Sequence, residues 1–182
     1  MYSAIKEQIY TIEDIENLPE GEHADLIEGT IYMHASPLRI HQEISGRLLQ
    51  KILNTIDRND LPCKAYAAPF GVFINGEEDI YHYVEPDLSV ICDPDKLTRR
   101  GCNGAPDWII EIASPSSMQM DYIRKLALYE QAGVREYWIV NPENQTVRTY
   151  DFQDYDTAEW SFKDSIPVSI LEGYTICIAD LL

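Results

Sequence analysis

Two acidic side chains lie in or beside apolar strand-like runs and could carry chemistry. Glu111 lies within WIIEIA, and Asp87 opens the run DLSVIC. Alternation along a strand places Glu111 on the same face as Ile109 and Ala113. An isolated buried carboxylate is costly, so we expect Glu111 to be raised in pKa, ion-paired or bound to a cation.

The same two carboxylates are suited to hold one divalent ion if their strands are neighbours. Backbones of adjacent strands lie about 5 Å apart, and Mg²⁺ needs only one or two carboxylates beside water and phosphate oxygens. Asp107 lies about 13 Å from Glu111 along the same strand and is not expected to join them. Two alternatives remain open: Asp87 meets solvent or an arginine, and Glu111 forms a structural ion pair.

Lys125 is the third candidate and lies on a predicted helix over residues 118–132. Helical spacing predicts a buried stripe of Tyr122, Leu126 and Tyr129, with Lys125 at its edge. From there its ammonium could orient a water or stabilise charge developing in phosphodiester hydrolysis. Asp121 lies four residues earlier, so an exposed helix ion pair explains Lys125 equally well.

The elements that must position these residues alternate between helical and strand-like patterns. A short helix (12–18) precedes a hairpin that turns at Glu28-Gly29, and an amphipathic helix (41–56) follows with Ile44, Leu48, Ile52 and Ile56 on one stripe. Next come strand-like runs at 64–74, 83–93 and 107–114, the helix that ends at Gly133, and strand-like runs at 136–142, 146–152 and 173–182. This order predicts one α/β domain with a mixed central sheet and an N-terminal hairpin.

Composition limits the partners of this chain. Its 14 Lys and Arg against 31 Asp and Glu give a net charge of −17, so whole-surface attraction to phosphate or anionic lipid is excluded. A nucleic acid would need a metal ion or a local basic patch, for which Arg99 and Arg100 are the candidates. No window approaches the roughly 20 apolar residues of a membrane span, and the N-terminus lacks an apolar signal-peptide core. We therefore expect a cytoplasmic protein without a membrane partner.

Cysteine and histidine spacing argues against zinc. The four cysteines (Cys63, Cys92, Cys102 and Cys177) contain no CxxC pair and have no zinc-like spacing with the histidines. We expect buried thiols rather than disulfides. The sequence also lacks a GxSxG elbow and a P-loop, which argues against α/β-hydrolase and nucleotide-hydrolase chemistry.

Three segments taken together resemble a known bacterial family. EPDLSVICD, GAPDWIIEIASPSS and the helix-strand run D-x-x-x-KLALYEQAGV-x-EYWIVNP are similar to the Uma-type putative restriction endonucleases of the PD-(D/E)XK nuclease superfamily, over about residues 25–150. The resemblance implies a restriction-endonuclease-like fold, with a nuclease core at 37–150 between an N-terminal helix and hairpin (1–36) and C-terminal strands (151–182).

The resemblance also implies a site. The strand aspartate falls on Asp87 and the strand glutamate on Glu111, both as metal ligands. The superfamily's lysine position, two residues after the glutamate, holds Ala113, and in this family the lysine corresponds to Lys125 on the following helix. The early hairpin acid corresponds to Asp25 and the histidine before the first long helix to His41; a structural role in the hairpin and the helix cap is the alternative for these two residues.

The activity implied is hydrolysis of DNA phosphodiester bonds with Mg²⁺ or Mn²⁺, by a homodimer because two strands need two sites. Ala113 and the acidic composition favour an alternative, a nuclease-fold protein that binds nucleic acid or a protein partner without cutting. A third reading is a hydrolase that uses two carboxylates as general acid and base, which would not depend on metal.

Overall fold

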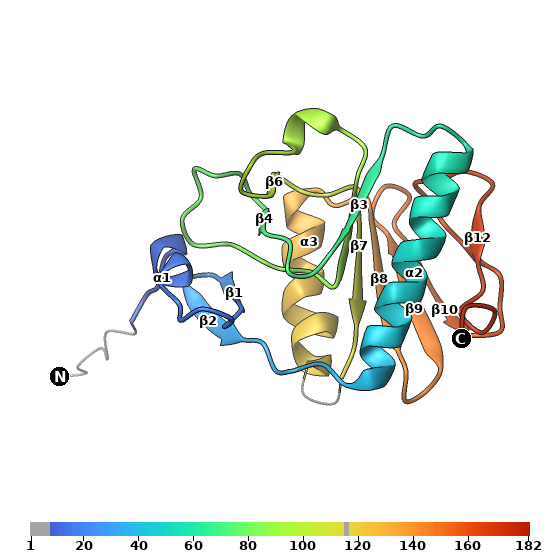
Figure 1. Cartoon of the computed structure of the whole chain (residues 1–182), viewed down its shortest axis with the longest axis horizontal. Helices are drawn as coiled ribbons and strands as arrows, with labels where there is room; N and C mark the ends of the chain where they lie inside the picture. Colours follow the sequence, from blue (N-terminus) through green and yellow to red (C-terminus); the bar gives the residue numbers. More distant parts are fainter. Residues whose placement is uncertain (1–7, 115–116) are drawn as a thin grey trace.

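A mixed sheet forms the centre of the computed structural model, which describes residues 8–114 and 117–182 (Figure 1). Its six strands lie in the order β10-β9-β8-β7-β5-β3. The β7–β8 pair is parallel, and the other neighbouring pairs are antiparallel. The strands are β3 (Lys64–Ala67), β5 (Leu88–Ile91), β7 (Trp108–Ile112), β8 (Glu136–Asn141), β9 (Thr146–Asp151) and β10 (Asp156–Ser161). The predicted mixed α/β domain is confirmed.

Helices and short strand pairs surround this sheet. They are the helices α1 (Ile12–Glu16), α2 (Arg39–Arg58), η1 (Pro94–Lys96), η2 (Met120–Lys125) and α3 (Leu126–Ala132), and three short strand pairs: β1 (Ala24–Ile27) with β2 (Thr30–Met33), β4 (Val72–Phe73) with β6 (Cys102–Asn103), and β11 (Ile166–Pro167) with β12 (Thr175–Ile176). In Figure 1, α2 and α3 lie on either side of β7.

Each face of the sheet has its own apolar core. The stripe Ile44, Leu48, Ile52 and Ile56 of α2 is buried, as predicted, and packs with Trp108, Ile110 and Trp138 on one face. On the other face, α3 contributes Leu128 and Tyr129 to a cluster with Ile109 and Ile139. The central strand β7 is therefore covered on both sides, which makes its one acidic residue, Glu111, a buried one.

The N-terminal hairpin forms at the predicted turn. Glu28 and Gly29 both have positive φ, 51° and 72°, which is the backbone of a type I′ turn. The hairpin is attached to the segment before β5, because Leu26 exchanges backbone hydrogen bonds of 2.7 and 2.9 Å with Tyr83. This attachment fixes Asp25 next to the sheet.

The predicted helix over 118–132 is regular only in its second half. Its first part, η2, is a π-helix, and α3 then continues to Gly133, whose φ of 88° ends the helix as expected. The fully buried residues are Asp121, Lys125, Leu128 and Tyr129, while Tyr122 and Leu126 of the predicted stripe are half-buried and pack against the same apolar cluster as Tyr129. A π turn holds more residues than an α turn, and this shifts the phase of every side chain before Leu126.

Two further expectations need correction. Cys63 and Cys92 form a disulfide, because the β3–β5 register that pairs Lys64 with Ile91 brings the preceding and following cysteines together. Cys102 is a free, buried cysteine, as expected. The edge strand β10 lies within the C-terminal strands that the resemblance implied, although no strand-like run was recognised at 156–161, and the final apolar run forms only the two-residue β12. Within the described part of the chain, no helix is long and apolar enough to cross a membrane.

Candidate active site

Asp87 and Glu111 are neighbours, as their strands predict. β5 and β7 are antiparallel with Leu88 opposite Ile110, and the same register places Asp87 opposite Glu111. The Asp87 amide points to Glu111 Oε2 at 3.5 Å, and Asp87 Oδ2 accepts a hydrogen bond from the Ile112 amide at 2.7 Å. Asp107 does not join Asp87 and Glu111. It accepts hydrogen bonds from Arg135 and from the Cys92 amide instead.

Lys125 is buried and ion-paired rather than exposed. Its side chain is 6% exposed, and its Nζ lies 2.8 Å from both Asp25 Oδ2 and Glu111 Oε1. Asp121 Oδ1 is farther away, at 4.0 Å, and Asp121 is itself buried. The exposed Asp121–Lys125 pair considered from the sequence is therefore wrong, and Lys125 instead joins the hairpin to the central strand.

The π-helical turn explains how Asp121, Lys125 and Tyr129 come to lie on one side of the helix, so that Lys125 and Tyr129 both reach Glu111. In an α-helix, residues four apart drift by about 40° around the axis. A π turn holds more than four residues, so the same step drifts in the opposite direction. Because a π step from Asp121 to Lys125 precedes an α step to Tyr129, the two drifts offset each other. Both Lys125 Nζ and Tyr129 Oη donate to Glu111 Oε1, each at 2.8 Å.

Asp25 is held on both of its oxygens. Oδ1 accepts a hydrogen bond from the Glu85 amide at 2.9 Å and lies 3.2 Å from His34 Nε2, while Oδ2 pairs with Lys125. Burial alone would raise the pKa of Asp25, but the Lys125 ammonium and the hydrogen bond from His34 hold it well below its usual value. Asp25 is thus an anion that fixes Lys125 from the hairpin side.

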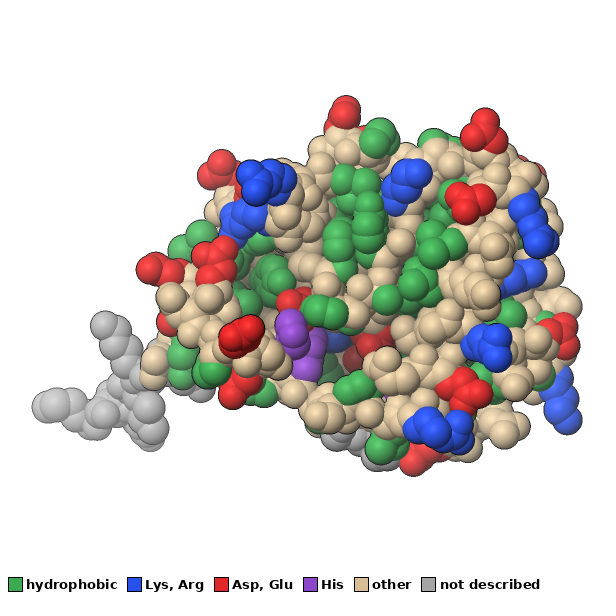
Figure 2. Space-filling view, viewed as in Figure 1, with side chains coloured by type: hydrophobic (Ala, Val, Ile, Leu, Met, Phe, Trp, Pro, Cys, Tyr) green, Lys and Arg blue, Asp and Glu red, His purple; other side chains and the backbone are tan. Residues whose placement is uncertain are grey.

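His41 lies on the α2 side of the same site. Its Nε2 is 3.0 Å from Asp87 Oδ2, and its buried Nδ1 has no hydrogen-bond partner among the described residues. The structure therefore brings all five sequence-predicted residues together: Asp25, His41, Asp87, Glu111 and Lys125. Figure 2 shows a histidine and acidic side chains where the surface is hollowed between the β1–β2 hairpin and the sheet.

The electrostatics of the cluster depend on Lys125. Burial raises the pKa of Glu111 to about 8, with the Lys125 charge opposing the shift and the Asp87 charge adding to it. Burial would lower the pKa of Lys125, but the charges of Asp25 and Glu111 raise it well above its usual value. The cluster thus contains one cation that stays charged and a glutamate whose ionisation costs free energy.

Sequence reasoning did not assign a role to three residues of this cluster. Tyr129 donates to Glu111, Ser117 Oγ donates to Asp121 Oδ2 at 2.7 Å, and His34 pairs with Asp25. The only signal for Tyr129 was its place on an apolar stripe. His34 carried none, because its partner is fixed by the hairpin register and not by a motif.

The donor set is suitable for a hard divalent cation. The side-chain donors to Glu111 use Oε1, and the hydrogen bonds described for Asp87 use Oδ2; Asp87 Oδ1, and Glu111 Oε2 beside its 3.5 Å contact with the Asp87 amide, can still accept a ligand. Two carboxylates with oxygen donors suit Mg²⁺ or Mn²⁺. In residues 8–114 and 117–182, no three His, Cys, Asp or Glu side chains form a complete metal cage, so water or phosphate would have to complete the shell.

Comparison with known proteins shows the family of this chain. The family model described as "Putative restriction endonuclease" (Uma2) matches residues 10–179. The chain belongs to this family. An uncharacterized protein of Synechocystis sp. is 26% identical over 136 residues, which are 74% of this chain and 69% of that protein.

A crystal structure shares the fold of this family member. It is that of a putative nuclease, belonging to DUF820, from Anabaena variabilis. The two structures superpose with a TM-score of 0.74 at 24% identity, over 94% of this chain and 96% of the other. The match covers nearly the whole of both chains, so the two proteins share their fold.

Proposed function

We propose that this protein is a metal-dependent endonuclease that hydrolyses DNA phosphodiester bonds. The observation that carries the proposal is the position of Lys125. Its Nζ lies 2.8 Å from Glu111, the glutamate opposite Asp87, although it comes from the helix after the strand and not from Ala113. Paired carboxylates can hold a metal ion and a lysine can stabilise the charge that develops on phosphate, and both effects promote phosphoryl hydrolysis.

Each residue then has a stated task. Asp87 and Glu111 would hold Mg²⁺ or Mn²⁺, which when bound polarises a phosphate oxygen and activates water. Lys125 neutralises charge that develops on the phosphate. Asp25 keeps the Lys125 ammonium beside Glu111, and the Ile112 amide fixes Asp87 through a hydrogen bond of 2.7 Å. His41, 3.0 Å from Asp87, orients that carboxylate from α2.

The acidic composition makes the ion necessary for DNA binding as well. With a net charge of −17, the protein repels a phosphate backbone unless charge is neutralised locally. Arg100 offers little help, because it pairs with Glu16 and lies near Glu77. Bound divalent ions, and a second site supplied by a homodimer, would allow both strands to be cut.

The experiment measures conversion of supercoiled plasmid to nicked and linear forms, with about 10 mM Mg²⁺ or Mn²⁺ or with EDTA. Glu111→Gln should lower cleavage by at least about 100-fold, because loss of a ligand exceeds the 10–100-fold cost of losing a ligand's support. The matched control is Glu136→Gln, which alters another buried glutamate one strand away and should cleave normally per folded molecule.

The alternative proposal is a protein of the same fold that binds nucleic acid or a protein partner without cutting, and Ala113 favours it. Metal-dependent DNA binding with no cleavage would support that alternative and contradict the first proposal. Equal cleavage by Glu111→Gln and the unaltered protein would contradict the assignment of the site.

A further inference from the structure

Tyr129 is a buried residue of the cluster to which the proposed hydrolysis assigns no task. It lies on α3, its side chain is fully buried, and its hydroxyl donates to Glu111 Oε1 at 2.8 Å. A phenylalanine would fill the same apolar space, so packing alone does not explain the hydroxyl. Because the hydroxyl bonds to a proposed metal ligand, its effect is expected at that ligand.

The two oxygens of Glu111 have different surroundings. Oε1 faces the helix and accepts hydrogen bonds from Lys125 Nζ and Tyr129 Oη, each at 2.8 Å. Oε2 faces β5 and lies 3.5 Å from the Asp87 amide. A carboxylate oxygen offers about two acceptor positions, so two donors fill those of Oε1. A cation can therefore reach Glu111 only through Oε2, on the side of Asp87.

Packing and pairing hold both donors in place. The Tyr129 ring packs edge-on against the Tyr137 ring, with the centroids 4.9 Å apart at an angle of 82°. Tyr137 is itself fixed, because its hydroxyl donates to the backbone carbonyl of Asp121 in η2 at 3.2 Å. The ammonium of Lys125 is held from the hairpin by Asp25. Neither donor can leave the Oε1 atom without breaking these other contacts.

A carboxylate with one available oxygen distinguishes between divalent cations. Mg²⁺ requires a near-ideal octahedral shell, keeps several waters and needs only one or two carboxylates. Ca²⁺ takes six to eight oxygen ligands and often uses both oxygens of a carboxylate. The donors at Glu111 Oε1 therefore disfavour Ca²⁺ more than the smaller ion.

We infer that Tyr129 is a positioning residue that restricts Glu111 to one coordinating oxygen and so makes the site prefer Mg²⁺ or Mn²⁺ to Ca²⁺. The inference rests on the proposed function, because it concerns the metal site formed by Asp87 and Glu111. It adds the residue that determines which cation binds there. Tyr129 acts through Glu111 and is not itself a ligand.

The test measures metal binding to the full chain without DNA, from the electron paramagnetic resonance signal of free Mn²⁺. Ca²⁺ is then added to displace the bound Mn²⁺, in about 0.15 M KCl to screen the general attraction of the acidic surface for cations. The unaltered protein should bind Mn²⁺ more tightly than Ca²⁺. Tyr129→Phe removes one donor from Oε1, so the preference for Mn²⁺ should fall by about tenfold, as loss of a ligand's support predicts.

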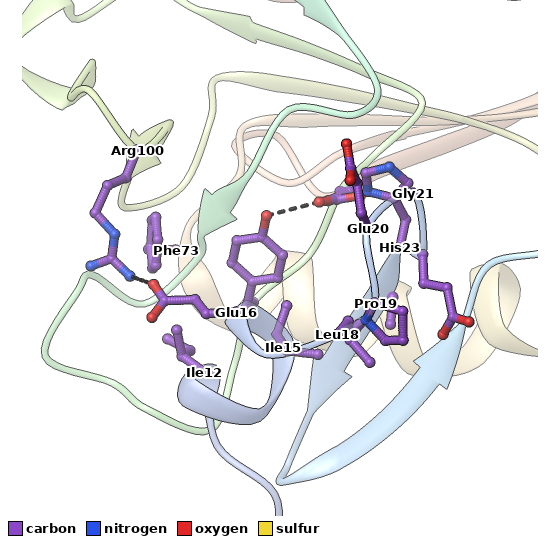
Figure 3. A pocket seen from close by; sticks show the side chains of 14 residues that line it. Ile12, Ile15, Glu16, Leu18, Pro19, Glu20, Gly21, His23, Phe73 and Arg100 are labelled. Atoms are coloured by element: carbon purple, nitrogen blue, oxygen red, sulfur yellow. Dashed lines mark hydrogen bonds and ion pairs between the residues drawn. The ribbon is translucent and has the colours of Figure 1, made fainter.

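The matched control is Tyr83→Phe. It removes a hydroxyl that also donates to a glutamate, Glu85 Oε1, at 2.9 Å. Both residues line the pocket of about 400 Å³ beside α1 that Figure 3 shows, and neither proposed metal ligand lines that pocket. Tyr83→Phe should therefore keep the cation preference of the unaltered protein, because its lost bond does not involve Glu111.

Glu111→Gln separates this inference from the proposal on which it rests. We expect this variant to lose Mn²⁺ binding. If it does, and Tyr129→Phe keeps the preference of the unaltered protein, the inference is overturned and the nuclease proposal stands. Mn²⁺ binding that persists in Glu111→Gln would overturn both. Equal affinity of the unaltered protein for Ca²⁺ and Mn²⁺ would overturn the inference even if Tyr129→Phe did not fold.

Discussion

Two glutamates on neighbouring strands are equally buried but have different partners. Glu111 on β7 and Glu136 on β8 are 4% and 1% exposed, and they face opposite sides of the sheet, since Glu136 pairs with Trp108 in the β7–β8 register. Burial raises the pKa of both, to about 8 and about 7. The difference lies in their partners.

Glu136 is surrounded by neutral donors. Its Oε1 accepts a hydrogen bond from Trp138 Nε1 at 2.6 Å, and Oε2 accepts one from the Ile170 amide at 3.0 Å. These contacts attach the C-terminal segment to the sheet. Glu111 instead meets Lys125, Tyr129 and a second carboxylate, all ionisable groups beside a hollow surface. The two glutamates therefore differ in the charge of their partners and not in their burial.

The largest expected effect that tests this contrast is removal of the Lys125 charge. Lys125→Met leaves Asp25 and Glu111 buried without their cation, which should cost about 3–5 kcal/mol of the free energy of unfolding. Urea unfolding measures this loss, and Lys163→Met, at an exposed lysine, should change stability by less than about 0.5 kcal/mol. Similar small losses in both variants would contradict the ion-pair network.

A smaller loss of stability is expected when Glu136 is changed. Glu136→Gln places an amide NH₂ group against one of the N–H donors, so the free energy of unfolding should fall by about 1–3 kcal/mol. Urea unfolding again gives the value. A variant that kept its stability but lost cleavage would place Glu136 in the chemistry and remove the contrast with Glu111.

The smallest effect depends on pH and involves His34. Burial alone would lower the pKa of His34, but the hydrogen bond to Asp25 and the Asp25 charge raise it above its ordinary value. The stabilisation is thus fully present below about pH 6.5 and is lost as the pH rises through the raised pKa. His34→Gln should therefore lower the melting temperature more at pH 5.5 than at pH 9. An equal decrease at both pH values would show that the pair carries no charge-dependent stabilisation.

Local patterns predicted much of this molecule. The α2 stripe, the Glu28-Gly29 turn and the adjacency of Asp87 and Glu111 follow from periodicity, turn chemistry and strand order. Glu136 was missed although it carries the same signal as Glu111, an acid in an apolar strand. The sequence cannot distinguish them, because their partners are set by tertiary packing.

The contacts of Lys125 were the least predictable part of the site. Its burial depends on a π turn, in which backbone hydrogen bonds span five residues instead of four. No residue in MDYIRK is an obvious signal for such a turn. Its partner Asp25 lies 100 residues earlier, on a hairpin whose position is fixed by backbone bonds to Tyr83. The Cys63–Cys92 disulfide likewise required knowledge of the β3–β5 register.

The most direct test compares thermal melting of the unaltered protein, Glu111→Gln and Glu136→Gln, with and without about 10 mM Mn²⁺. A ligand at 100 times its Kd stabilises the folded state by about 2.7 kcal/mol, so a moderate site is detectable. We predict that Mn²⁺ raises the melting temperature of the unaltered protein and of Glu136→Gln, and that this rise disappears in Glu111→Gln. An equal rise in all three proteins would contradict an ion site at Glu111 and leave only general screening of the −17 charge.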